Sequence, residues 1–134
     1  MCKPKEISVV ATSIAVTEIL DQLGISKNQV IGIPQSDSYT VPKKYQKAIK
    51  VGNAMSPDME KISNLNPDLI LSPNSLESDL SSKYEKIKIS SSFLNLKNLS
   101  GMYKSIEELG KLFNKEKQAK KLIDEYVNYM TSFR

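Results

Sequence analysis

The segment from Gly52 to Ser72 constrains the fold more than any other part of the chain. It opens with a glycine that allows a tight turn. Ser56 follows as a favourable helix N-cap, and Pro57 suits the first helical position, where a missing N–H costs nothing. The Asn-Pro pair at 66–67 ends the predicted helix, and the apolar run at 69–71 predicts a buried strand. The segment therefore predicts a loop, a short helix and a buried strand in close succession.

Met55 lies in the loop of that segment, immediately before the predicted helix. Its neighbours are small or polar, and it falls outside the apolar stripe that Met59, Ile62 and Leu65 form along the helix. One interpretation makes Met55 a gap-filler in the core, which is the usual role of a methionine. The loop composition favours the other interpretation, in which the thioether is exposed at the surface.

Short apolar runs alternate with amphipathic segments along the whole chain. Strands are predicted at 6–11, 30–33, 50–51, 69–71 and 86–90, and helices at 14–23, 43–48, 57–65, 76–84, 102–113 and 115–133. Gly24 is placed to end the first helix as a C′ glycine. Alternating strands and helices indicate an α/β fold with a mostly parallel sheet. We therefore predict a three-layer, Rossmann-like domain with helices on both faces of the sheet.

Composition excludes several classes of function. The chain has 134 residues, which is enough for one core, and its net charge of +4 comes from scattered lysines that do not predict nucleic-acid binding. Histidine is absent, so a Ser-His-Asp triad or a Cys-His pair is excluded within this chain. No pair of carboxylates has a distinctive catalytic setting. We expect a protein that is not an enzyme.

Four polar segments follow predicted strands, at 11–14, 36–40, 53–57 and 72–75. In an open parallel sheet, ligands bind beyond the carboxyl ends of the strands, so these segments should share one edge. The helix that starts at 14 would also bring free N–H groups there, which attract anions. Plain N-capping explains the Thr-Ser pair that precedes the helix equally well.

Several segments carry a resemblance to a known family, and together they run over roughly residues 6 to 130. They span 11–23, 38–45, 52–72 and 101–110, and the Pro-Asp-Leu-Ile-Leu element within the third is moderately specific. The chain resembles the N-terminal lobe of helical-backbone metal receptors in the periplasmic-binding-protein superfamily. These extracytoplasmic receptors deliver haem, cobalamin or ferric siderophores to ABC importers. The pattern is most similar to the haem-receptor lipoproteins of iron-regulated surface determinant systems.

The resemblance implies a haem site in a cleft between two lobes, one wall of which this chain would supply. Met55 matches a methionine that is an axial ligand of the haem iron in the resembled receptors, where a histidine of the second lobe is the other ligand. Ser38 and Tyr39 match a segment whose hydroxyls approach a haem propionate, although Tyr39 would also suit a loop aromatic that covers the sheet edge. The remaining expected contacts are Thr12, Ser13, Ile14 and Ser72.

The resemblance also implies partners and a location. An ABC permease would meet a surface glutamate, for which Glu60 is the candidate, and cell-surface haem carriers would supply the ligand. Cys2 would carry a lipid that anchors the protein to the extracellular face of the bacterial cytoplasmic membrane; otherwise it is an unstructured terminal thiol. Residues 1–5 would be a flexible tether, 6–113 the lobe, and 114–134 the start of the helix that joins two lobes. A complete small domain with a frayed end is the alternative.

Other functions fit parts of the pattern. A siderophore or cobalamin receptor would favour cationic or aromatic contacts, but the polar segments contain no Arg and the chain has no Trp. A flavodoxin-like interaction or regulatory domain would need a Gly-rich loop or an acidic pocket after the first strand, and residues 11–14 show neither. A pure interaction module stays open.

Overall fold

A single parallel sheet forms the centre of the computed structural model, which describes residues 6–132. Its strands are β1 (Val9–Ala11), β2 (Val30–Ile33), β3 (Ile49–Lys50), β4 (Leu69–Pro73) and β5 (Ser91–Leu94), arranged in the order β3-β2-β1-β4-β5. The helices are α1 (Ile14–Gln22), α2 (Met59–Leu65), α3 (Glu77–Lys86), α4 (Leu99–Leu112) and α5 (Glu116–Thr131), with short 3-10 helices η1 (Lys43–Tyr45) and η2 (Asn74–Leu76). The predicted α/β fold is confirmed, and every observed strand pair is parallel.

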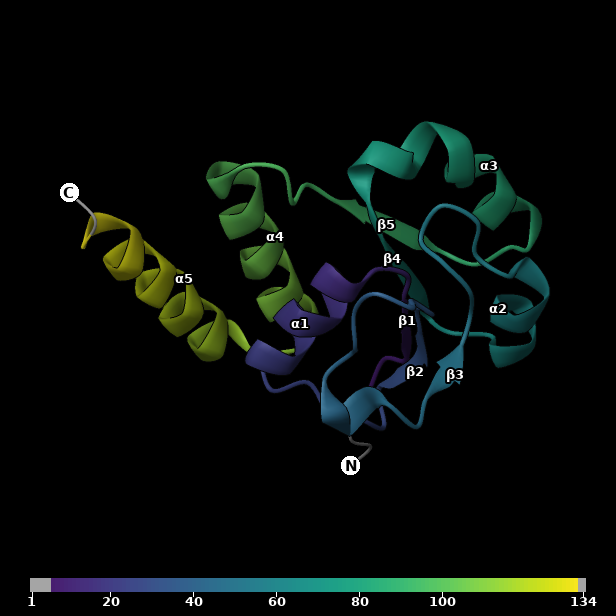
Figure 1. Cartoon of the computed structure of the whole chain (residues 1–134), viewed down its shortest axis with the longest axis horizontal. Coiled ribbons are helices and arrows are strands. Elements are labelled where there is room, and N and C mark those ends of the chain that lie inside the picture. The colour runs from purple at the N-terminus through teal and green to yellow at the C-terminus, as the bar shows by residue number, and fades with distance from the viewer. Residues whose placement is uncertain (1–5, 133–134) are drawn as a thin grey trace, which may run out of the picture.

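Helices cover both faces of the sheet, as the three-layer prediction requires. Figure 1 shows α1 and α4 on one side and α2 and α3 on the other, with α5 beside α4 and extending away from the body. Neighbouring residues of β1 divide between the layers: Val9 packs into the apolar core on the α1 side, and Val10 into the core on the α2 and α3 side. This arrangement buries the sheet on both faces, which is the usual requirement for parallel strands.

The first helix follows the sequence prediction closely. Ser13 is the N-cap of α1, and its side chain accepts a hydrogen bond from Val16 N–H. Leu23 lies at the C-cap, and Gly24 follows with φ +75°, the left-handed conformation expected of a C′ glycine. The helix packs Val16 and the apolar side chains of its next turn against the sheet. This packing fixes the start of α1 at the carboxyl end of β1.

The predicted start of the second helix is wrong. The N-cap of α2 is Asp58, whose side chain accepts from Lys61 N–H at 3.1 Å. Pro57 instead pairs with Gly52 in an isolated antiparallel bridge. Asp58 N–H also donates to the Val51 carbonyl at 2.6 Å, and Asp58 itself has an extended backbone, so the helix begins only after it.

The predicted strand at 86–90 is also wrong. Lys86 is the last residue of α3, and Lys88 has φ +60°, which places it in a tight turn. The strand forms one turn later, at Ser91–Leu94, where it pairs with β4. The alternating Lys-Ile pattern at 86–89 therefore belongs to a helix end and a turn.

The C-terminal helix buries only part of its predicted apolar stripe. Ala119 and Leu122 are buried against the body, whereas Val127 and Met130 are exposed. Within residues 6–132, no helix has both the length and the apolar character needed to cross a bilayer. The expected tether at 1–5, including Cys2, lies outside the described residues.

Candidate functional site

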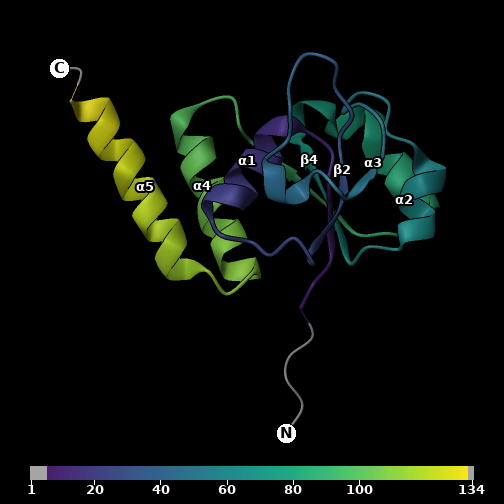
Figure 2. The same cartoon turned by 60° about the horizontal axis from the view of Figure 1, so that its bottom comes forward.

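The carboxyl ends of all five strands lie at one edge of the sheet, because every pairing is parallel. We call this edge the rim, formed by residues 12–14, 34–42, 51–58 and 74–76. The strand order reverses between β1 and β4, and a ligand crevice normally opens at such a switch point. In Figure 2, the loop after β2 stands at the top of the molecule, above the sheet. The polar segments that the sequence singles out therefore do follow strands at the same edge.

Met55 occupies the tip of a tight turn on the rim. The isolated bridge between Gly52 and Pro57 closes the base of the turn. Ser56 N–H donates to both the backbone carbonyl and the Oδ1 of Asn53, at 3.3 and 2.8 Å. Met55 is 76% exposed. The turn therefore presents the thioether to solvent, as the loop composition predicts.

Gly52 makes this turn sterically feasible. Its φ is +93°, a conformation that other residues rarely adopt. A Cβ at this position would lie 3.3 Å from the Ser56 carbonyl oxygen and 3.4 Å from Asp58 N. The Gly52 carbonyl also accepts a hydrogen bond from Gln35 N–H at 2.9 Å, which ties the Met55 turn to the loop after β2. Two loops far apart in sequence are thus held as one unit.

The loop after β2 carries Ser38 and Tyr39, both exposed. Ser36 Oγ accepts hydrogen bonds from the N–H groups of both residues at 3.2 Å, which shapes this part of the loop. Tyr39 is 70% exposed, so its hydroxyl is available to a ligand. A hollow of about 350 Å³ opens beside it, with Lys50 at the end of β3 and Asp37 among its lining residues.

The N-terminus of α1 supplies hydrogen-bond donors to the rim. Ser13 caps the helix, and both Ser13 and Ile14 are half-buried. Among the described residues, no group accepts from the N–H of Ile14 or Ala15, so both donors stay open to an anion. Thr12 is different, because it is fully buried and its Oγ1 donates to the Leu71 carbonyl at 3.0 Å. Its hydroxyl faces the interior and is not placed to contact a ligand on the rim.

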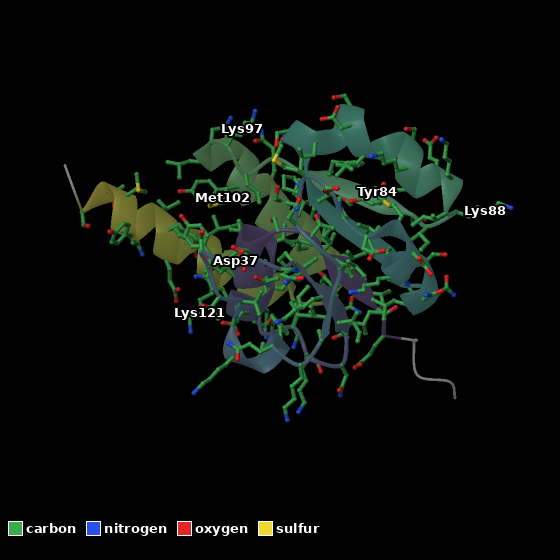
Figure 3. The ribbon with its side chains drawn as sticks, turned by 45° about the vertical axis from the view of Figure 1, so that its right-hand side comes forward. Asp37, Tyr84, Lys88, Lys97, Met102 and Lys121 are labelled. Carbon is green, nitrogen blue, oxygen red and sulfur yellow. The ribbon has the colours of Figure 1, made fainter. Side chains whose placement is uncertain are left out.

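Ser72 is also buried and turned away from the rim. It lies within β4, where it shares a face with Ile70 and therefore points toward the α3 side. Figure 3 shows Tyr84 reaching from α3 toward the sheet. Neither Ser72 Oγ nor Tyr84 Oη makes a hydrogen bond of good geometry in the described structure. Burial raises the pKa of Tyr84, and the Ser72 and Thr12 hydroxyls beside the phenol partly offset that rise.

Sequence reasoning included Ser36 and Asn53 in the polar segments of the rim but missed that their side chains shape its turns, and it missed Lys50. Asn53 and Ser36 have the polar side chains that commonly stabilise turns through backbone N–H groups, and this signal is present in the sequence. Lys50 carries no such signal, because its position beside the hollow depends on the pairing of β3 with β2. In residues 6–132, no three His, Cys, Asp or Glu side chains gather as a metal site would require.

Comparison with known proteins assigns the family. The family model described as periplasmic binding protein matches residues 9–134. The chain belongs to the periplasmic binding protein family. This assignment agrees with the parallel sheet, the switch point and the polar rim.

Three similar proteins have names that state a ligand or a role. The high-affinity heme uptake system protein IsdE of Staphylococcus aureus (strain Newman) is 33% identical over 122 residues, which cover 91% of this chain and 40% of IsdE. An ABC transporter substrate-binding protein from Listeria monocytogenes EGD-e has a TM-score of 0.87 at 37% identity, covering 92% of this chain and 46% of that one. The siderophore-binding protein BauB, bound to acinetobactin and ferric iron, has a TM-score of 0.80 at 25% identity, covering 96% and 48%. The chain thus spans less than half the length of these relatives.

Proposed function

We propose that this chain forms one wall of the haem site in a substrate-binding protein of an ABC importer. The observation that carries the proposal is the exposure of Met55, a residue that is 76% exposed at the tip of a turn on the rim. An exposed, braced methionine is unusual for a core gap-filler and suits a soft axial ligand of haem iron. The similarity to IsdE supports haem as the ligand.

The rim also offers donors for the carboxylates of haem. The open N–H groups of Ile14 and Ala15 would receive one propionate at the start of α1. The Ser38 and Tyr39 hydroxyls would approach the other, on a loop that Ser36 and the Gly52 carbonyl hold in place. No step of covalent chemistry is needed, so the protein would act by binding and release.

A second lobe would complete the cleft and supply the other axial ligand. Residues 6–113 would be the N-terminal lobe, and 114–134 the start of the helix that joins the lobes. The exposed Val127 and Met130 on α5 suit a helix that packs against further protein. The greater length of the relatives supports this arrangement.

The anchoring and the partners follow from the same proposal. A lipid on Cys2 would hold the protein at the extracellular face of the cytoplasmic membrane. Glu60 is exposed in the first turn of α2, close in sequence to the Met55 turn, and is the candidate contact with the permease. Cell-surface haem carriers would load the site.

A ferric siderophore is the second candidate ligand, supported by the similarity to BauB and by the polar hollow beside Tyr39 and Lys50. The two ligands make different demands on Met55. A siderophore surrounds its iron with hard oxygen ligands, which leave no place for a thioether. Substitution of Met55 would therefore weaken haem binding and leave siderophore binding unchanged.

Titration of the purified chain with haem, followed by visible absorption, tests the proposal. Met55→Leu removes the sulfur at nearly constant volume, and Met130→Leu makes the same change at an exposed methionine on α5. We expect at least a tenfold weaker affinity in Met55→Leu, which corresponds to about 1.4 kcal/mol, and no change in Met130→Leu. Equal binding by Met55→Leu and the parent chain, or no binding by either, would contradict the haem assignment.

A further inference from the structure

A second hollow, of about 660 Å³, lies at the opposite end of the sheet from the rim. Its lining combines an apolar floor with lysines. The apolar residues include Val30, Ile31, Ala48, Ile49 and Leu65, and the lysines are Lys27, Lys43, Lys44 and Lys47. Among residues 6–132, no aspartate or glutamate lines it. We call this feature the lysine hollow.

The topology fixes where the lysine hollow lies. Lys27 comes just before β2, Lys43–Ala48 come before β3, and Leu65 is the last residue of α2, which returns toward the starts of the strands. The chain also enters the fold at this end. Val9 N–H donates to the Gln29 carbonyl at 2.7 Å, and Gln29 Nε2 donates to the Ile7 carbonyl at 3.2 Å.

Most of the positive charge around the lysine hollow is uncompensated. Lys44 is the exception, because its Nζ lies 3.5 Å from Asp21 Oδ1 and 5.2 Å from the centre of the Tyr45 ring. Within residues 6–132, Lys27, Lys43 and Lys47 form no ion pair. Three unpaired ammonium groups beside an apolar floor suit a binding partner that carries both negative charges and apolar groups.

We infer that the lysine hollow docks the protein on anionic phospholipid head groups. Lysine stems can lie along the apolar floor while their ammonium groups reach phosphates. Each lysine near an anionic bilayer contributes roughly fivefold to binding, so three lysines contribute about a hundredfold. The uptake of a phosphate ion alone would need a more enclosed site with several converging donors.

The choice of a bilayer rests on the lipid proposed for Cys2. A chain extends at most about 3.6 Å per residue, so a lipid on Cys2 lies within roughly 15 Å of Glu6. Glu6 precedes Ile7, and the Ile7 carbonyl accepts a hydrogen bond from Gln29, close to the lysine hollow. A lipid anchor would therefore bring this end of the domain to the membrane. In this docked orientation, the rim with Met55 and the start of α2 with Glu60 face away from the bilayer. The rim is then open to an incoming ligand, and contact with the permease would require the domain to leave this orientation.

Co-sedimentation with vesicles tests the inference, using the 134-residue chain without a lipid. The vesicles contain phosphatidylglycerol in phosphatidylcholine, and pure phosphatidylcholine is the reference. One variant replaces the unpaired lysines of the hollow by glutamine, at Lys27, Lys43 and Lys47. The control variant makes the same charge change at exposed lysines of α3, α4 and α5, at Lys83, Lys104 and Lys121.

We expect binding to the anionic vesicles only, with about a hundredfold loss in the hollow variant and much less in the control. Equal losses in both variants would show that net charge alone drives binding, which overturns the inference. The absence of vesicle binding would overturn it too, and would leave an acidic protein partner as the alternative. Full displacement by inorganic phosphate at constant ionic strength would identify a phosphate-ion site instead. Haem titration of the hollow variant reports on the rim separately, so the two proposals fail independently.

Discussion

Gly52→Ala tests whether the turn, and not only the sulfur, makes the candidate site. Gly52 has φ +93°, and a Cβ there would press against the Ser56 carbonyl oxygen at 3.3 Å. Gly24→Ala is the matched control, because Gly24 has φ +75° and a Cβ added there would have no neighbouring atom within 4 Å. Both substitutions place an alanine at positive φ, but only one does so beside Met55.

The expected cost in stability is similar for the two variants. An L-residue at positive φ costs roughly 1–2 kcal/mol. Unfolding entropy of about 2.1 cal/mol/K per residue gives roughly 0.3 kcal/mol/K for this chain, so Tm should fall by about 4–7 °C. The crowding against Ser56 adds to the cost for Gly52→Ala, and it is relieved by a shift of the turn that moves Met55.

Thermal unfolding and haem titration together separate the two effects. We expect both variants to lose stability, while only Gly52→Ala loses haem affinity, toward the level of Met55→Leu. A Gly52→Ala variant with normal haem affinity would refute the claim that the turn positions the thioether. Equal losses of affinity in both variants would show that stability alone controls binding.

Three further predictions concern stability, each measured by chemical or thermal unfolding. Tyr45→Phe should lower the free energy of unfolding by about 1–3 kcal/mol, because Tyr45 Oη donates to the Ile25 carbonyl at 2.7 Å. Tyr84→Phe should be neutral or stabilising, because the buried Tyr84 hydroxyl makes no hydrogen bond of good geometry within the described residues. Asp58→Ala should lower the free energy of unfolding by about 1 kcal/mol, because Asp58 is the N-cap of α2, and Ser56→Ala should lower it much less. A larger loss in Ser56→Ala than in Asp58→Ala would instead support Ser56 as the N-cap, as expected from the sequence. Burial raises the pKa of both tyrosines, so their contribution to stability should be constant below the ordinary tyrosine pKa of about 10. Above that pH stability should fall as the unfolded phenols ionise, by up to about 1.4 kcal/mol per pH unit for each tyrosine. A stability that stays level into strong alkali would contradict the burial of these phenols.

The sequence predicted the elements whose signals are local. The strand at 30–33 is a short apolar run, and Gly24 ends a helix with a clear apolar face, so both appear as expected. The predicted strand at 86–90 was wrong, because a helix end followed by a turn can show the same alternation of charged and apolar residues as a strand. What places β5 at 91–94 is its pairing with β4, a contact between distant parts of the chain.

In the candidate site, too, some features follow from the local sequence and others depend on contacts between distant segments. The exposure of Met55 follows from the small and polar residues around it, which are visible in the sequence. The burial of Thr12 and Ser72 is not visible there, because it depends on contacts between distant segments: Tyr84 of α3 lies beside both hydroxyls. Ser72 resembles a loop residue after a strand, but β4 continues to Pro73, and strand alternation then turns its side chain inward.

X-ray absorption at the iron edge of the haem-loaded chain tests the central claim most directly. If Met55 binds the iron, the first coordination shell contains a sulfur atom in the parent chain and in Met130→Leu, and this sulfur is lost in Met55→Leu. A first shell of nitrogen and oxygen alone in the parent chain would contradict the account.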